Sequence, residues 1–595
     1  MRHSIQHASQ AAQLICLTAI TSATQFVMAD DPYWALRAPD DVQREPTIGV
    51  SATHIVQTTN FTIAVYDRSG TALWSAALDQ VVEPPPPGTP YFWDGVPNPF
   101  PANYFFDVRV IYDQFSNRFV VTMLHNQHRN FVVAFSRDAS PDGPGFDHWD
   151  KYYLDGRINE SPPGGGGIPD MDWPALGVNW NGVHLVTILR VASGAQGLSY
   201  VDQILRRPPP GDCSDGSCDF YTTTSNHARV HLPLPIDIPY ENSKIHTRLP
   251  MPAHSFGATT ADTAYLIQLL DPGDVKANAS AEIRILAVTI DSAGAVVNEH
   301  RFFDDIPGGY PLFLVAQKCG GDMNNWKENF QNLVWQAGTL YTVRMQPRED
   351  EYGPRFVAHW YKIDVSTWPA EPFPFSPFPS ILDDGVVDLG RVFASDSFGD
   401  DAACDRTSHA VFPYVMPTTT GELALFFTRM HAYGYADLCL TGRRLTDPPG
   451  VMGAPIVPLV TGSAAVSGGH QWGDYEGTAR DPNSGGTIWY TGETGRCDPI
   501  VSPCTTCVSG PYCTGAGTLQ GQLLYYFHTA IGSYTIPTQS MKTLTIRRGA
   551  GNQPPSIPVK IMPADVYSLI DCTLTSGAPT HIRTFGHGSN VTLRA

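Results

Sequence analysis

The chain repeats one arrangement of apolar and polar positions. An apolar stretch, a tight turn rich in Gly, Asn, Asp or Thr, and a second apolar stretch recur about every 60 to 85 residues. The copies are Val108–Leu124, Ala175–Leu189, Leu333–Met345, Val411–Met430 and Tyr475–Tyr490. Each copy predicts a β-hairpin, and because a hairpin cannot bury both of its faces alone, a circular array of hairpins is expected. The pattern therefore predicts an all-β fold, a β-propeller.

The spacing of these units predicts about seven blades, or six if the first unit supplies only a closing strand. The units begin near Ile48, Asp107, Asp172, Gly257, Asn332, His409 and Asp474. We expect the propeller to occupy residues 30–548. Residues 549–595 read as a linker followed by a short C-terminal β extension, because a Gly/Pro-containing segment precedes new apolar runs there.

Composition supports short strands and narrows the partners. The chain has 53 Gly and 51 Pro, while only 16% of its residues are charged, which favours strands joined by loops. The net charge is −19, so the chain repels phosphate backbones, and no basic stripe compensates. Nucleic acid is not an expected partner.

The first residues are typical of an export signal. Arg2 precedes an apolar segment that ends in Val27-Met28-Ala29 before Asp30, which predicts a signal peptide over residues 1–29 and a secreted or cell-surface protein. No later segment is apolar enough to predict a membrane span.

The cysteines agree with an oxidising compartment. Ten remain after the leader, an even number that favours disulfides. Cys213 and Cys218 lie close enough to staple one loop. A second cluster contains Cys497, Cys504, Cys507 and Cys513. The Cys504–Cys507 spacing could also hold zinc, but disulfides are favoured outside the cell. No cofactor is expected, although Asp212, Asp215 and Asp219 could hold calcium if they did not belong to a stapled turn.

Charged and aromatic residues where the first strand of each unit begins are the candidate site. They are Asp107, Arg109, Asp172, Trp173, His409, Trp472, Asp474, Tyr475 and Glu476. Carboxylates gathered at one mouth of the channel could act as acid and base on a glycan, with Asp107, Asp172, Asp474 and Glu476 as candidates. The alternative is that each Asp accepts hydrogen bonds from backbone N–H groups where a blade begins.

The segment Trp472-Gly-Asp-Tyr-Glu476 is the sharpest local cluster. Its two aromatic rings and two carboxylates suit stacking on a sugar and hydrogen bonding to its hydroxyls. A packing motif between blades is the alternative interpretation. We expect Arg109, Trp173, His409, Trp472, Asp474 and Tyr475 to contact a ligand if this face of the channel binds one.

Several short segments together resemble a family of secreted bacterial β-propeller proteins of largely uncharacterised function. They include His54–Asn60, Asp107–Asp113, Asp172–Val178, Gly442–Gly450 and Trp472–Pro482. The last, with its Trp-Gly-Asp-Tyr-x-Gly core, is the most specific. The resemblance implies a propeller and export, and it carries no catalytic residues. Val559–Asp565 and Asn590–Leu593 resemble part of a small β-repeat found at the ends of bacterial surface proteins.

These observations favour an extracellular protein that recognises a glycan or a protein at the channel face. The alternative is a carbohydrate-active enzyme, either a glycoside hydrolase or a polysaccharide lyase, that uses the carboxylates named above. Whether the chain is an enzyme stays open at this point.

Overall fold

In the computed structural model the chain folds entirely into strands and their connections over the described residues. These are residues 26–27, 45–78, 88–96, 105–125, 130–155, 169–191, 198–213, 227–232, 249–257, 263–270, 280–291, 294–307, 330–350, 353–369, 378–390, 408–431, 434–454, 456–460, 462, 475–496, 526–536, 542–547, 556–563, 570–575, 580–585 and 591–594. Within these ranges there is no helix of the length and apolarity needed to cross a bilayer. The predicted all-β class is confirmed.

Successive strands pair as antiparallel meanders of four. The first two sheets are β2 (Thr47–Val50), β3 (His54–Thr58), β4 (Thr62–Asp67) and β5 (Ala72–Ala77), then β6 (Phe105–Asp113), β7 (Arg118–His125), β8 (Asn130–Ser136) and β9 (Trp149–Asp155). The next meanders are β10 (Pro169–Asn179), β11 (Gly182–Val191), β12 (Leu198–Leu205) and β13 (His227–Leu232), then β14 (Met251–Phe256), β15 (Thr263–Leu270), β16 (Ser280–Asp291) and β17 (Gly294–Pro307).

The later strands continue the same order. They are β18 (Phe330–Gln336), β19 (Thr339–Asp350), β20 (Gly353–Asp364) and β21 (Ser380–Val387), then β22 (His409–Pro417), β23 (Leu423–His431), β24 (Gly434–Arg443) and β25 (Val457–Val460). The last sheet holds β26 (Gly477–Arg480), β27 (Thr487–Arg496), β28 (Tyr526–Thr535) and the short β1 (Phe26–Val27), which pairs with β28.

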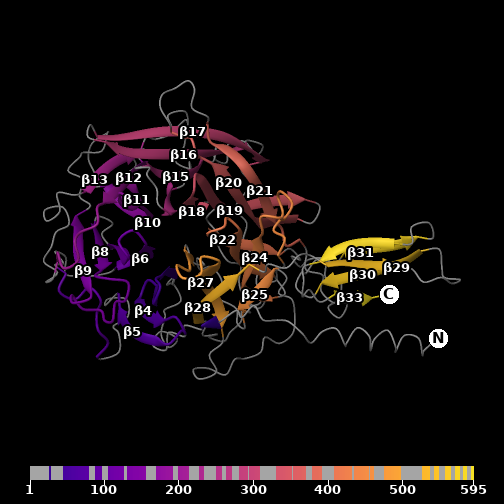
Figure 1. Ribbon diagram of the computed structural model, residues 1–595, viewed down its shortest axis with the longest axis horizontal. Coiled ribbons are helices and arrows are strands. Elements are labelled where there is room, and N and C mark those ends of the chain that lie inside the picture. Colours follow the sequence, from indigo (N-terminus) through magenta and orange to yellow (C-terminus); the bar gives the residue numbers. More distant parts are fainter. Residues whose placement is uncertain are drawn as a thin grey trace, which may run out of the picture.

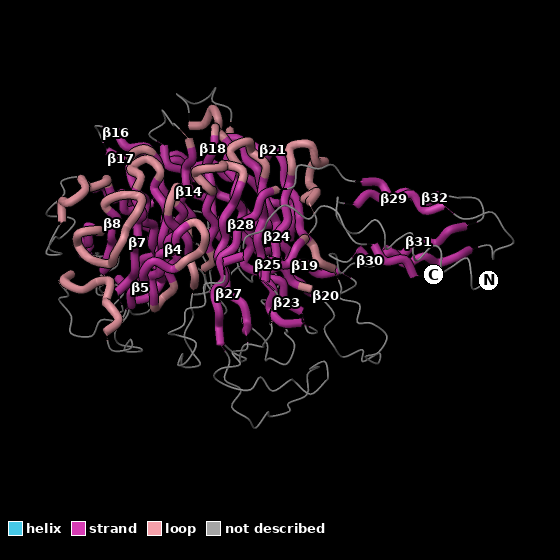
Figure 2. Tube along the Cα trace, turned by 60° about the horizontal axis from the view of Figure 1, so that its bottom comes forward, coloured by secondary structure: helices cyan, strands magenta, loops and turns pink. Residues whose placement is uncertain are grey.

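The first strand of each meander faces a common centre. Strand β2 contacts β6, β6 contacts β10, and the contacts continue through β14, β18 and β22 to β26, which contacts β2 again. Figure 1 shows the meanders following one another around this centre in sequence order, and Figure 2 shows the same strands from another side. The inner strands β10, β14 and β18 also pair in parallel, which joins their meanders into one twelve-stranded sheet. The fold is propeller-like.

Four inner segments share an unusual backbone position. Glu45, Asp107, Trp173 and Phe412 all have a positive φ, between 48° and 55°. Each lies six residues before the polar residue that opens the following turn, namely Ser51, Asp113, Asn179 and Thr418. At the last three positions the pairing with the next strand shifts register. A left-handed residue inside a β-bulge is therefore part of the repeat, and it turns the strand toward the centre.

The inner strands approach so closely that side chains are excluded at some positions. A Cβ on Gly477 would lie 2.7 Å from the backbone N of Ile48, and one on Gly177 would lie 2.6 Å from the backbone O of Ala253. Glycine is required at both places because the neighbouring backbone cannot move away. This explains the glycine that follows Glu476 in the sequence motif.

The first and last sheets are joined mainly by side chains. The Gln57 amide donates to Thr491 Oγ1 over 2.8 Å, and the Glu45 N–H donates to the Glu493 carboxylate, also over 2.8 Å. Arg68 forms an ion pair with Asp481. An apolar cluster between the two sheets adds to these contacts and contains Ile48, Val50, Ile55, Tyr66, Ala479, Trp489 and Ile531.

The five hairpins predicted from the sequence are confirmed as β6–β7, β10–β11, β18–β19, β22–β23 and β26–β27. The start of the fourth unit was placed incorrectly. Its inner strand β14 ends at Phe256, before the predicted start at Gly257, because the short run Met251–Phe256 contains a proline and a histidine that interrupt the apolar pattern. Beyond the meanders, β29 (Lys542–Arg547) pairs with β32 (Thr580–Phe585), and β30 (Ser556–Pro563) pairs with β31 (Ile570–Thr575) and β33 (Val591–Arg594).

Candidate functional site

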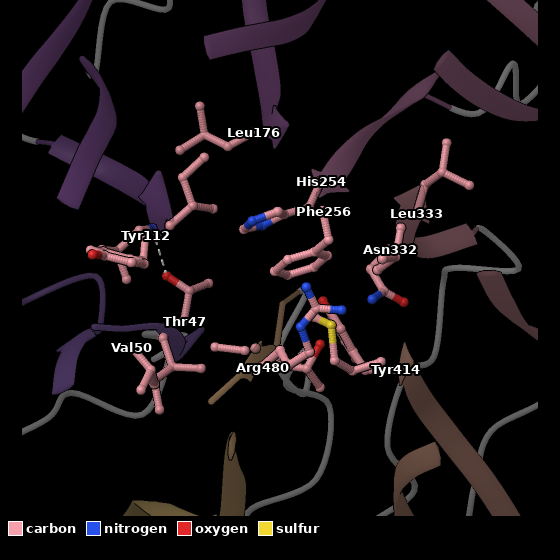
Figure 3. Close-up of a pocket in the computed structure, with 18 of the residues that line it drawn as sticks. Thr47, Val50, Tyr112, Leu176, His254, Phe256, Asn332, Leu333, Tyr414 and Arg480 are labelled. Atoms are coloured by element: carbon pink, nitrogen blue, oxygen red, sulfur yellow. Dashed lines mark hydrogen bonds between the residues drawn. The ribbon is translucent and has the colours of Figure 1, made fainter. Parts of the chain in front are cut away.

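A cavity of about 290 Å³ lies among the inner strands. Its wall combines aliphatic and aromatic side chains with a small number of polar ones (Figure 3). The lining residues include Thr47, Arg109, Tyr112, Gln114, Leu176, His254, Phe256, Asn332, Leu333, Tyr414, Glu476 and Arg480. This volume is close to the lower end of the range for small-molecule sites, about 300 Å³.

Arg109 lies in the part of the cavity near the beginnings of the inner strands. Its guanidinium is 3.4 Å from the centre of the Tyr475 ring, and Nε donates to the backbone O of Pro174 over 2.9 Å. Burial raises the pKa of the nearby Tyr414 phenol to about 12, and the Arg109 charge acts in the opposite direction. Arg109 thus reaches from β6 to β10 and to the segments that precede β26.

Arg480 crosses the cavity nearer the other end. Its guanidinium lies 3.8 Å from the centre of the Phe256 ring and donates to the side-chain oxygen of Gln336. Figure 3 shows Arg480 and Phe256 facing one another inside the cavity. Burial lowers the pKa of Arg480 to about 10, so its side chain is still charged at neutral pH.

His254 and Gln114 form the wall beside Phe256. His254 Nε2 lies 3.1 Å from Gln114 Oε1, and the imidazole stacks on the Phe256 ring with centres 4.4 Å apart. Burial lowers the pKa of His254 to about 4, and the Arg480 charge adds to this effect, while Asp113 opposes it. The imidazole is therefore neutral at pH 7.

The carboxyl group of Glu476 is turned toward the neighbouring strands and away from open solvent. It accepts a hydrogen bond from Thr428 Oγ1 over 2.9 Å and another from the Tyr490 hydroxyl. Burial raises the pKa of Glu476 from 4.5 to about 8, and the charge of Glu493 contributes in the same direction. At neutral pH this acid is largely protonated.

The charges in the cavity are consequently unbalanced. Over the described part of the chain, no carboxylate lies within ion-pair distance of Arg109 or Arg480. Asp481, which also lines the cavity, is held by Arg68 and by the Trp489 indole N–H. The arrangement suits an anionic ligand, because the buried Arg109 and the half-buried Arg480 have only neutral partners among the described residues.

The structure brings some of the predicted site residues together and separates others. Arg109, Tyr475 and Glu476 meet at one end of the cavity. Asp107 is buried in the left-handed bulge with a φ of 55°, and Trp173 occupies the equivalent position in β10 with a φ of 52°. His409 is buried, and its Nδ1 accepts from the Phe356 N–H over 3.3 Å, so it lies in the wall between β20 and β22.

Other predicted residues cannot be placed. Trp472, Asp474, Cys218, Cys497, Cys504, Cys507 and Cys513 lie outside the described residues, as do Asp215 and Asp219. For Asp172 only the backbone is described. Cys213 is buried and takes part in a disulfide, while the expected pairing with Cys218 stays a prediction. Where side chains are described, no three His, Cys, Asp or Glu residues gather in a way that suits a metal ion.

Sequence reasoning missed Arg480, Phe256 and Gln336. The available signal was a lone arginine in Gly477-Thr-Ala-Arg480, a strand otherwise made of small residues. Such a strand leaves room at the centre, and a long cationic side chain can fill it.

Comparisons with known proteins identify no family. No protein-family model matches the chain, and no curated protein matches it. Among solved structures it is similar to an α-L-arabinanase of Penicillium chrysogenum complexed with arabinobiose, with 9% identity over 80% of this chain and 94% of that one and a TM-score of 0.31. A Trypanosoma rangeli sialidase in complex with 2,3-difluorosialic acid has 10% identity, coverage of 72% and 54%, and a TM-score of 0.31.

The extracellular domains of Drosophila semaphorin 1a are also similar, with 10% identity over 76% of this chain and 86% of that one and a TM-score of 0.30. Two carbohydrate-active proteins and a semaphorin thus resemble the chain to the same low degree. Similarity at this level does not extend to activity.

Proposed function

We propose that the protein recognises a carboxylate-bearing sugar in its central cavity. The observation that carries the proposal is that the buried guanidinium group of Arg109 and the half-buried one of Arg480 have no carboxylate partner among the described residues. A sugar carboxylate would supply the missing negative charge and accept charge-assisted hydrogen bonds. The predicted leader at residues 1–29 would place this binding outside the cell.

We infer a closed seven-bladed propeller as the scaffold. The support is that seven successive meanders each begin with an inner strand, and each inner strand contacts the next until β26 contacts β2. In such a ring the axial cavity is shared by all the blades. Arg109 of β6 and Arg480 of β26, which come from different blades, can then both reach one ligand.

The lining suits a sugar unit. Tyr112 and Leu176 can pack on the faces of the ring, while Tyr414 provides a polar group near its hydroxyls. A cavity of about 290 Å³ has room for one or two sugar units. The ligand is therefore expected to be short or to enter by one end.

Among the described residues, the placement of the two carboxyl groups that line the cavity favours recognition over hydrolysis. Glycoside hydrolysis requires two carboxyl groups about 5 to 10 Å apart that both face the substrate. Here Glu476 is bonded to Thr428 and Tyr490, and Asp481 is bonded to Arg68. Each group is engaged by the blades themselves.

The experiment is a binding titration with monomeric galacturonate, glucuronate and N-acetylneuraminate. We expect at least one acidic sugar to bind the wild type, and Arg109→Gln and Arg480→Gln each to weaken it about tenfold or more, because a hydrogen bond to a charged group contributes about 1.5–3 kcal/mol. Glucose and galactose, which are similar in size and neutral, should bind more weakly.

Arg348→Gln is the matched control. Arg348 lies at the surface and pairs with Asp388 over 3.4 Å, so its loss should leave binding unchanged. If neutral and acidic sugars bound equally well, or if the two cavity variants bound like the wild type, the proposal would be wrong.

A carbohydrate-active enzyme is the second candidate, and the protonated Glu476 favours it. An acid with a pKa of about 8 can donate a proton to a leaving group at neutral pH. The test is mass spectrometry of soluble products from a polysaccharide panel, with Glu476→Gln beside the wild type. Oligosaccharides formed by the wild type and lost in the variant would favour catalysis, with unsaturated products indicating a lyase. An unchanged panel would leave recognition as the function.

A further inference from the structure

Trp180 is a large aromatic residue that lies at the surface and not in the core. It follows Asn179 in the turn between β10 and β11, and 57% of its surface is exposed. A tryptophan this exposed contributes little to the core, and its large flat face is available to a ligand. Its indole meets the Phe115 ring edge-on, with centres 5.8 Å apart and planes at 90°.

The two turns that carry these rings are locked together by Arg207. Arg207 donates to both oxygens of Asp113, which opens the turn that contains Phe115, and to the backbone oxygens of Asn179 and Trp180. Its guanidinium also lies 5.3 Å from the centre of the Phe115 ring. Arg207 thus binds the backbone of Trp180 and leaves the indole ring exposed.

The turns are stiffened internally as well. Asp113 accepts from the Phe115 N–H over 3.0 Å and from Ser116 Oγ over 2.6 Å. Asn179 accepts from the N–H groups of Asn181 and Gly182 over 2.9 and 3.2 Å. The aromatic pair is therefore preorganised, which reduces the entropy lost when a ligand stacks on it.

The aromatic pair is continuous with the cavity. Gln114, the residue before Phe115, lines the cavity and bonds His254 beside the Phe256 ring. Within the repeat, Gln114 and Trp180 are equivalent, since each follows the polar residue that opens its turn. One turn residue thus faces the cavity, and its equivalent in the next meander is exposed to solvent.

We propose that Trp180, held in place by Phe115 and Arg207, is a stacking platform beside the cavity for the second and following units of an acidic oligosaccharide. This inference rests on the proposed function, because the end unit would occupy the cavity between Arg109 and Arg480. Apolar faces of successive sugar rings stack on exposed indoles. The ligand class is therefore a linear oligosaccharide of uronic acids held by one end, and a free monosaccharide would occupy only part of the site.

The test compares each uronic acid of a panel (galacturonate, glucuronate and mannuronate) as the monomer and as its linear tetramer. For an acid that binds, the wild type should hold the tetramer about tenfold more tightly than the monomer. Trp180→Ala should abolish this advantage and leave monomer binding unchanged. Trp180→Phe should retain most of the advantage, since it preserves an aromatic face.

Leu445→Ala is the matched control, because Leu445 is 58% exposed and follows β24 on a different meander. Equal affinity for monomer and tetramer, or a Trp180→Ala variant that keeps the advantage, would overturn the platform and leave the cavity proposal standing. Failure of every monomer and tetramer to bind the wild type would overturn both. The two failures are thus distinguishable.

Discussion

Glu476 is an acid whose environment opposes its charge. Only 1% of the residue is exposed, and its carboxyl group accepts hydrogen bonds from the hydroxyl groups of Thr428 and Tyr490. Burial raises its pKa to about 8 from 4.5. Between these two pH values the folded chain holds a proton that the unfolded chain has released, so folding becomes less favourable as pH rises.

We predict that the wild type loses stability between pH 5 and pH 8 partly through Glu476. The contribution should have a slope of up to about 1.4 kcal/mol per pH unit. Glu476→Gln should flatten the profile, because a neutral amide cannot release a proton. Urea unfolding at the two pH values measures this. Glu422→Gln, in the turn between β22 and β23, is the control, and equal profiles for wild type and Glu476→Gln would contradict the prediction.

Individual residues also show why the site could be predicted only in part from the sequence. The sequence placed Arg109 and Asp107 together at the start of an inner strand, but only Arg109 lines the cavity. The bulge at Asp107 inserts an extra residue, and this reverses the alternation of side chains along β6. No pattern of apolar and polar residues reveals such a reversal. The position of a long side chain such as that of Arg480 likewise depends on residues of other strands, here Phe256 and Gln336, and not on its own strand.

At the scale of elements, the hairpins were predictable because two apolar runs around a polar turn carry their own signal. The start of β14 was not, since its six residues include Pro252 and His254. The distance between inner strands could not be predicted either, because it depends on how the sheets assemble. Gly477 illustrates it, because its Cα hydrogen faces the backbone of β2.

We predict that Gly477→Ala destabilises the fold by about 1–3 kcal/mol, since a methyl group would have to push two inner strands apart. Gly486→Ala, in the turn that follows β26, is the matched control, because the nearest atom to a new Cβ there is 3.9 Å away. Urea unfolding of both variants gives the comparison. A Gly477→Ala variant as stable as Gly486→Ala would show that the inner strands can separate freely.

The junction of the first and last sheets depends on Asp481. It accepts from Arg68 and, over 3.2 Å, from the indole N–H of Trp489. We predict that Asp481→Ala lowers the free energy of unfolding by about 2 kcal/mol, because the half-buried guanidinium of Arg68 and the buried indole N–H of Trp489 lose their acceptor.

A double-mutant cycle with Arg68→Ala should return a coupling of about 0.5 kcal/mol or more. Asp142→Ala is the control, since the Asp142 side chain is 73% exposed and should change stability by about 0.5 kcal/mol at most. Additive effects in the cycle would mean that Arg68 and Asp481 do not act together in joining the first and last sheets.

At the scale of the whole molecule, the cavity and the surface have opposite charges. The chain carries a net charge of −19, while the cavity holds two arginines that lack acidic partners among the described residues. An anionic oligosaccharide is therefore repelled at long range and attracted at short range. Salt screens the first effect much more than the second, because the guanidinium group of Arg109 is buried and that of Arg480 is half-buried.

We predict that the association rate of an acidic oligosaccharide rises several-fold when ionic strength increases from about 0.01 M to about 0.1 M, over which the screening length falls from about 30 to about 10 Å. The dissociation rate should change less. Stopped-flow binding measures both, with a neutral oligosaccharide of the same length as the control. An association rate that falls with salt would mean that local attraction dominates the approach.

The two-residue strand β1 lies within the predicted signal peptide, so that removal of this peptide would change the last sheet. Phe26 and Val27 pair with Gly532 and Ile531 of β28, yet both residues lie within the segment that a signal peptidase is predicted to remove. Cleavage after Ala29 would release a strand together with the leader. The backbone groups of β28 that pair with β1 would then be open to a different strand, so that export itself would create a new docking edge on the last sheet.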